Sequence, residues 1–165
     1  MFAHDPAATS AVIEAVAACG RPQWAKLSPN TDRLVEVAGA AADAGAEAVT
    51  LVNTVLGMVV DRDRGAPGLG GGGGGLSGPA IHPVAVRAVH DVRRAHPDLP
   101  IVGVGGVTDA ASAVDLLMAG AHGIQVGTAT FADPASPERV LDQLERWVRR
   151  QGLATIEELS GSMHG

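Results

Sequence analysis

The sequence contains no tyrosine, one cysteine and one lysine, and aromatic side chains make up 2% of its 165 residues. The single cysteine, Cys19, excludes an internal disulfide framework and is typical of a reducing compartment. Because aromatic rings are so scarce, the core must be built from Val, Leu, Ile and Ala. These residues are the usual filling of a parallel sheet covered by helices.

Three further absences limit the partners of the chain. Its net charge is −6 and its basic residues are dispersed, which is not the electrostatic footprint of a nucleic-acid-binding protein. No apolar run reaches the roughly 20 residues that span a bilayer, and no Cys and His residues have the spacing of a metal site. We therefore expect a cytoplasmic protein that binds neither nucleic acid nor a membrane.

Short apolar runs alternate with helical patterns along the chain. Strands are predicted at residues 23–28, 48–53, 101–106 and 123–128, and helices at 5–19, 31–44, 83–95, 109–119 and 137–151. This alternation predicts a parallel sheet with right-handed crossovers. The pattern indicates one α/β domain over residues 1–152 and a C-terminal tail, 153–165, with a short helix at 155–159 before a frayed end.

One connection, residues 55–81, is long and contains six consecutive glycines at 70–75. A long connection inside a compact domain is usually a lid or a binding loop. The alternative is a flexible linker, which the immediate return of the strand–helix alternation disfavours.

Ligands of parallel α/β folds bind at the carboxyl ends of the strands. Two of the predicted ends carry Gly105-Gly106 and Gly127-Thr128. Such glycines expose backbone N–H groups and carry no obstructing side chain, so they predict a phosphate site. The alternative is that they only permit tight turns.

The other two strand ends carry polar side chains. Lys26 lies in an apolar strand, where it needs an anionic partner, and it could neutralise a developing negative charge or form a Schiff base. Alternatively, its stem reaches water at a sheet edge. Asn53 and Thr54 suit an amide or imide ligand, although Asn is also a common turn residue. We interpret His82, His90 and His96 as surface or helix-end residues, because their spacing gives no i, i+4 pair.

Five segments, in order along the chain, together resemble one family. They are KLSPN at residues 26–30, VNTVLGM at 52–58, GGLSGPAIHP at 74–83, VGVGG at 102–106 and QVGTA at 125–129. The chain resembles the C-terminal half of dihydroorotate dehydrogenases, most closely the soluble class that passes electrons from FMN through a partner subunit to NAD. The resemblance implies about four βα units of a (β/α)8 barrel.

The resemblance also implies that residues of this chain take part in the FMN-dependent oxidation of dihydroorotate to orotate, a step of pyrimidine biosynthesis. Lys26 would stabilise the charge of the reduced flavin, and Asn53 and Thr54 would bind the substrate. The remaining cofactor contacts implied are Val52 and Gly78 at the ring, and Gly105, Gly106, Gly127 and Thr128 at the phosphate. His82 stands where relatives often have lysine.

The resemblance also implies parts that this chain lacks. The family's base is a cysteine on a mobile loop, expected upstream of Met1, and Cys19 lies on the wrong element to replace it. We therefore expect the chain alone to be inactive, and to self-associate or to pair with the missing N-terminal half. An iron–sulfur FAD electron-transfer subunit is the expected partner of the whole enzyme.

Three alternatives to this function remain. One is a non-catalytic half-barrel that binds a phosphorylated ligand, and another is a flavoprotein similar to dihydropyrimidine dehydrogenase. The third is a lysine-dependent aldolase or a phosphosugar isomerase, which the Asn53-Thr54 pair disfavours.

Overall fold

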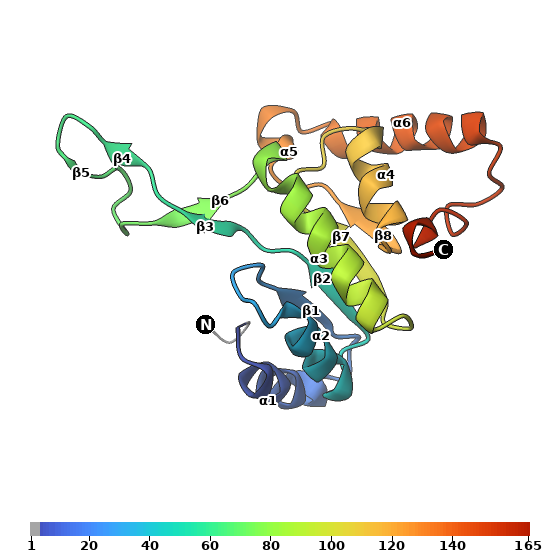
Figure 1. Ribbon diagram of the computed structural model, residues 1–165, viewed down its shortest axis with the longest axis horizontal. Coiled ribbons are helices and arrows are strands. Elements are labelled where there is room, and N and C mark those ends of the chain that lie inside the picture. The colour runs from blue at the N-terminus through green and yellow to red at the C-terminus, as the bar shows by residue number, and fades with distance from the viewer. Residues whose placement is uncertain (1–3) are drawn as a thin grey trace.

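The computed structural model describes residues 4–165 and contains a parallel sheet of four strands in the order β1-β2-β7-β8. Helices connect consecutive strands of this sheet, and Figure 1 shows α3 crossing in front of it. The strands are β1 Trp24–Leu27, β2 Ala48–Leu51, β7 Ile101–Val104 and β8 Gly123–Gln125. The connecting helices are α2 Leu34–Asp43, α3 His82–Ala95 and α4 Ala110–Met118. The predicted fold, a partial (β/α)8 barrel, is confirmed.

Each strand begins at or one residue after its predicted start and ends earlier than predicted, because the chain leaves the ladder to form loops. Two outer helices, α1 Pro6–Val16 and α6 Ser136–Gln151, complete the predicted set. Asp5 caps α1, where its side chain accepts a hydrogen bond from Ala8 N at 2.7 Å. No helix within residues 4–165 combines the length and apolar character needed to cross a bilayer.

The two faces of the sheet have different surroundings. Ala25 and Leu27 of β1 are buried in the core, whereas Trp24 is 58% exposed and Lys26 is also exposed. Side chains alternate between the faces of a strand, so one face of β1 packs on helices and the other is open. Of the two interpretations of Lys26, the structure fits the exposed one: β1 is an edge strand, and water can solvate the ammonium group on the open face without an anionic partner.

The connection at residues 55–81 forms an arm instead of an irregular loop. Strand β3 Val55–Gly57 pairs antiparallel with β6 Gly74–Leu76, and β4 Val60–Asp61 pairs with β5 Ala66–Pro67. Figure 1 shows this arm extending away from the main sheet. A Cβ atom at Gly75 would lie 2.2 Å from Thr54 Oγ1, so β6 needs a glycine at this point. The arm returns to the main body through the 3-10 turn η3 Pro79–Ile81.

The C-terminal tail does not form the predicted helix at 155–159, and it is docked where fraying was expected. It consists of turns and the 3-10 turn η4 Ser162–His164. Gly161 N donates to Leu117 O at 2.9 Å, and Ser160 Oγ donates to Ala121 O at 2.8 Å. Leu159 is buried in the core. The tail therefore packs against the end of α4. The first three residues of the predicted domain 1–152 lie outside the described residues.

Helix α4 begins with a capping box that positions the loop after β7. The Asp109 carboxylate accepts from Ser112 N at 2.9 Å, and Ser112 Oγ accepts from Asp109 N at 3.2 Å. The hydrogen bond from the Ser112 backbone is the largest of the contacts that lower the pKa of Asp109 below its ordinary value.

We predict that Asp109→Ala lowers the free energy of unfolding by about 1 kcal/mol at neutral pH. The pKa of Asp109 is lower in the folded state, so its contribution is present above the unfolded-state pKa of about 3.9 and is lost as the pH falls through the folded-state value. Urea unfolding of wild type and variant at several pH values measures this. Asp98→Ala, at an exposed loop carboxylate, is the control. An equal effect of both substitutions would contradict the prediction.

Candidate functional site

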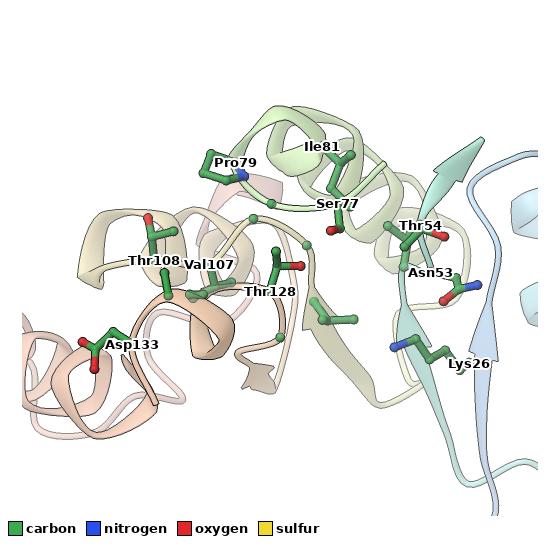
Figure 2. A pocket seen from close by; sticks show the side chains of 18 of the residues that line it. Lys26, Asn53, Thr54, Ser77, Pro79, Ile81, Val107, Thr108, Thr128 and Asp133 are labelled. Atoms are coloured by element: carbon green, nitrogen blue, oxygen red, sulfur yellow. The ribbon is translucent and has the colours of Figure 1, made fainter. Parts of the chain in front are cut away.

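A cleft of about 450 Å³ lies at the carboxyl ends of the sheet strands (Figure 2). All nine residues selected from the sequence line it: Lys26, Val52, Asn53, Thr54, Gly78, Gly105, Gly106, Gly127 and Thr128. Lys26 and Asn53 are at one end in Figure 2, and Val107, Thr108 and Asp133 are at the other. The structure thus brings together residues more than 100 positions apart in the sequence.

Glycine is required at position 106, where the loop after β7 meets the loop before α3 beside the cleft. Gly106 has φ 70°, and a Cβ atom there would lie 2.9 Å from Gly78 O and 2.7 Å from His82 Cβ. The loop after β7 therefore touches the loop that enters α3. This contact could not form with a larger residue, since an L side chain is strained at such a φ value as well as obstructed.

Gly127 has a different environment. A Cβ atom at this position would have no atom within 4 Å. Its carbonyl accepts from Thr130 N at 2.9 Å and from Thr130 Oγ1 at 2.8 Å, which fixes the turn into the short helix α5 Ala129–Ala132. The sequence did not predict α5. The absence of a side chain at Gly127 leaves open space in the cleft.

The backbone at the Asn53 end is held by the neighbouring strands. Val52 N donates to Val104 O, and Asn53 N donates to Leu27 O, both at 2.8 Å. The Asn53 side chain is exposed, and its amide has no hydrogen-bond partner among the described residues. The amide group is therefore available to a ligand, while the backbone that carries it is fixed.

Asn30 fixes the start of the arm beside this amide. Its Nδ2 donates to Thr54 O at 2.9 Å and to Ser28 Oγ at 2.9 Å, and its Oδ1 accepts from Leu56 N at 2.8 Å. Asn30 belongs to the KLSPN segment, but this role could not be assigned from the sequence, because its partners Thr54 and Leu56 are 24 and 26 positions away. It is a positioning residue for Thr54.

His82 links three elements around the glycine loop. Its Nδ1 lies 2.9 Å from Gly105 O, and its Nε2 lies 3.2 Å from Asp115 Oδ2 on α4. The sequence interpretation as a helix-end residue was correct for its place in α3 but missed these contacts. No sequence signal reports them, because the partners are 23 and 33 positions away.

Four polar residues of the cleft were not selected from the sequence: Ser77, Thr108, Asp133 and Arg139. Thr108 follows the Gly105-Gly106 pair closely enough to have been considered. Cys19 is exposed and lines a separate groove between α1 and β1. Within residues 4–165, no group of His, Cys, Asp and Glu side chains is arranged to hold a metal ion.

A parallel α/β half-barrel with a glycine-lined cleft at its strand ends defines the class of this protein. The family model described as dihydroorotate dehydrogenase matches residues 1–148. The chain therefore belongs to the dihydroorotate dehydrogenase family.

Three curated relatives are each named dihydroorotate dehydrogenase B (NAD(+)), catalytic subunit. The protein of Trichlorobacter lovleyi is 42% identical over 166 residues, covering 100% of this chain and 54% of the relative. That of Pelobacter propionicus is 44% identical over 167 residues, covering 99% and 54%. That of Desulforudis audaxviator is 45% identical over 164 residues, covering 99% and 53%. The chain spans about half the length of these relatives.

We predict that Gly106→Ala lowers the free energy of unfolding by about 2 kcal/mol or more, because it adds strain at a positive φ value to a backbone clash. Gly127→Ala should change it by less than about 1 kcal/mol, since its Cβ atom meets nothing. Chemical unfolding of both variants measures the difference. Similar losses for the two would show that the cleft loops are not packed as described.

Proposed function

We propose that this chain is the cofactor-binding half of an FMN-dependent dihydroorotate dehydrogenase, which oxidises (S)-dihydroorotate to orotate in pyrimidine biosynthesis. The observation that carries the proposal is the single cleft that joins the Lys26, Asn53 and Thr54 side chains to two glycine turns. Family membership supports the reaction, and the printed names of the relatives support NAD as the final acceptor.

The residues of the cleft fit a flavin mononucleotide. The phosphate would be held by the two strand-end turns, Gly105-Gly106 and Gly127-Thr128. No atom lies within 4 Å of a Cβ atom built at Gly127, so this side of the cleft has room for the phosphate. The volume of about 450 Å³ lies within the range of about 300–1,000 Å³ usual for small-ligand sites. Val52 and Gly78 would line the ring and exclude water from one of its faces.

When bound, FMN supplies the hydride acceptor of the reaction. Lys26 would place its positive charge where negative charge develops, and its exposed position leaves the ammonium group free to do so. Asn53 and Thr54 would orient the substrate through an amide and a hydroxyl group, each able to donate and accept hydrogen bonds. In this proposal, the base that removes the substrate proton comes from the part of the enzyme outside this chain.

The open face of the sheet supports the proposed partner. Trp24 and Lys26 are exposed on it, and β1 and β8 are edge strands of the four-stranded sheet. Unpaired strand edges favour association, so we propose that the other half of the barrel, or a second copy of this chain, covers them. An iron–sulfur FAD subunit would carry electrons onward from the completed enzyme, in the cytoplasm.

The second candidate function is a non-catalytic half-barrel that binds a phosphorylated ligand. Its specific support is the pair of glycine turns in the cleft, which would fit the phosphate of any phosphorylated ligand. A flavoprotein similar to dihydropyrimidine dehydrogenase stays an alternative for the substrate. In both alternatives, the Gly105-Gly106 and Gly127-Thr128 turns would hold the phosphate of the ligand.

The test is retention of FMN by the purified chain after saturation and desalting, measured by flavin absorbance. We expect close to one FMN per chain, and we expect Gly127→Val to lose it because the added side chain occupies the cleft. Gly70→Val is the control, since Gly70 lies in the arm and a Cβ atom there also meets no atom. A colourless wild-type protein, or equal retention by both variants, would count against the proposal.

A further inference from the structure

The cleft has three charged side chains, Lys26, Asp133 and Arg139, among the residues that line it. Lys26 lies at the Asn53 end, and Asp133 lies at the opposite end near Thr108 (Figure 2). Arg139 forms an ion pair with Asp133. The end of the cleft near Thr108, which follows the Gly105-Gly106 pair by two residues, therefore contains one negative and one positive charge that neutralise each other.

The loop between α5 and α6 fixes Asp133. Its backbone N donates to Ala129 O at 3.0 Å, and its Oδ1 accepts from Ala135 N at 3.0 Å. The other carboxylate oxygen, Oδ2, accepts from Arg139 Nη1. Asp133 thus stays in place through contacts of its own loop, whether or not Arg139 is bound to it.

Arg139 is less constrained than its partner. It lies near the start of α6 and its side chain is 45% exposed. Of the side-chain nitrogens, only Nη1 donates a hydrogen bond to a described residue. A guanidinium group has five N–H donors in a planar fork that matches phosphate oxygens. Most of these donors remain available to a ligand.

We propose that Arg139 contacts the phosphate of the bound flavin and makes the site selective for FMN over riboflavin, its dephosphorylated form. The assignment rests on the function proposed above. Without Arg139, the fixed carboxylate of Asp133 would repel a phosphate dianion. Arg139 therefore has two effects: it donates charge-assisted hydrogen bonds, and it neutralises a negative charge that the loop cannot move away.

This double role predicts a distinctive pattern of affinities. Arg139→Gln should weaken FMN about tenfold and leave riboflavin unchanged, since the group is half exposed and solvent screens part of its charge. Arg139→Lys should lie in between, because it keeps the charge and loses the fork. Adding Asp133→Asn to Arg139→Gln should recover several-fold of the lost affinity, because the repulsion is removed.

The experiment measures dissociation constants of FMN and riboflavin by flavin fluorescence with the full chain. Arg146→Gln is the matched control, because Arg146 is exposed, lies about two turns further along α6 and does not line the cleft. Thermal unfolding of each variant checks that it is folded.

Selective loss of FMN affinity in Arg139→Gln, with recovery in the double variant and no change in Arg146→Gln, supports the assignment. Equal FMN affinity of wild type and Arg139→Gln overturns it and leaves the flavin proposal intact. Equal weakening of FMN and riboflavin also overturns it, because Arg139 would then act on the shape of the cleft. Failure of the wild type to bind either flavin overturns the proposed function and this assignment together.

Discussion

Parallel pairing of the sheet strands is the constraint on which the cleft depends. In-register pairing places Lys26 beside Thr50 and Thr50 beside Val102. The ladder extends beyond the strands through Val52 N and Asn53 N, which donate to Val104 O and Leu27 O. Because all the strands run in one direction, their last residues meet at one edge. A shift of one residue would turn every side chain to the opposite face and separate the cleft residues.

Close approach of backbone segments is the second requirement. Gly106 lets the loop after β7 touch the loop before α3, and Gly75 lets the arm pass beside Thr54. Inside the core, Gly103 lets β7 approach α4 closely, since a Cβ atom at this position would lie 3.1 Å from Leu116 Cβ. At each of these glycines, two segments of the chain approach more closely than a side chain would allow.

The four sheet strands and the helices between them could be predicted from the sequence, because apolar periodicity marks them. The cleft could be predicted as well, since the ends of parallel strands can be located in the sequence and the topology brings them together. The arm could not. Strand β6 begins inside the run of glycines, which shows no alternation of side chains, and β3 is only three residues long. The exposure of Lys26 depends on what covers the open face of the sheet, which strand composition does not report. His82 and Arg139 act through partners on other elements, so their roles needed the tertiary structure.

The position of Lys26 has a practical consequence. It is the only lysine of the sequence, and it is exposed within the cleft. A reagent that modifies primary amines therefore has one side-chain target in the sequence, which peptide mapping separates from reaction at the N-terminal α-amino group. The extent of its modification reports directly on whether the cleft is occupied, without a fluorophore, an engineered label or a measurement of turnover.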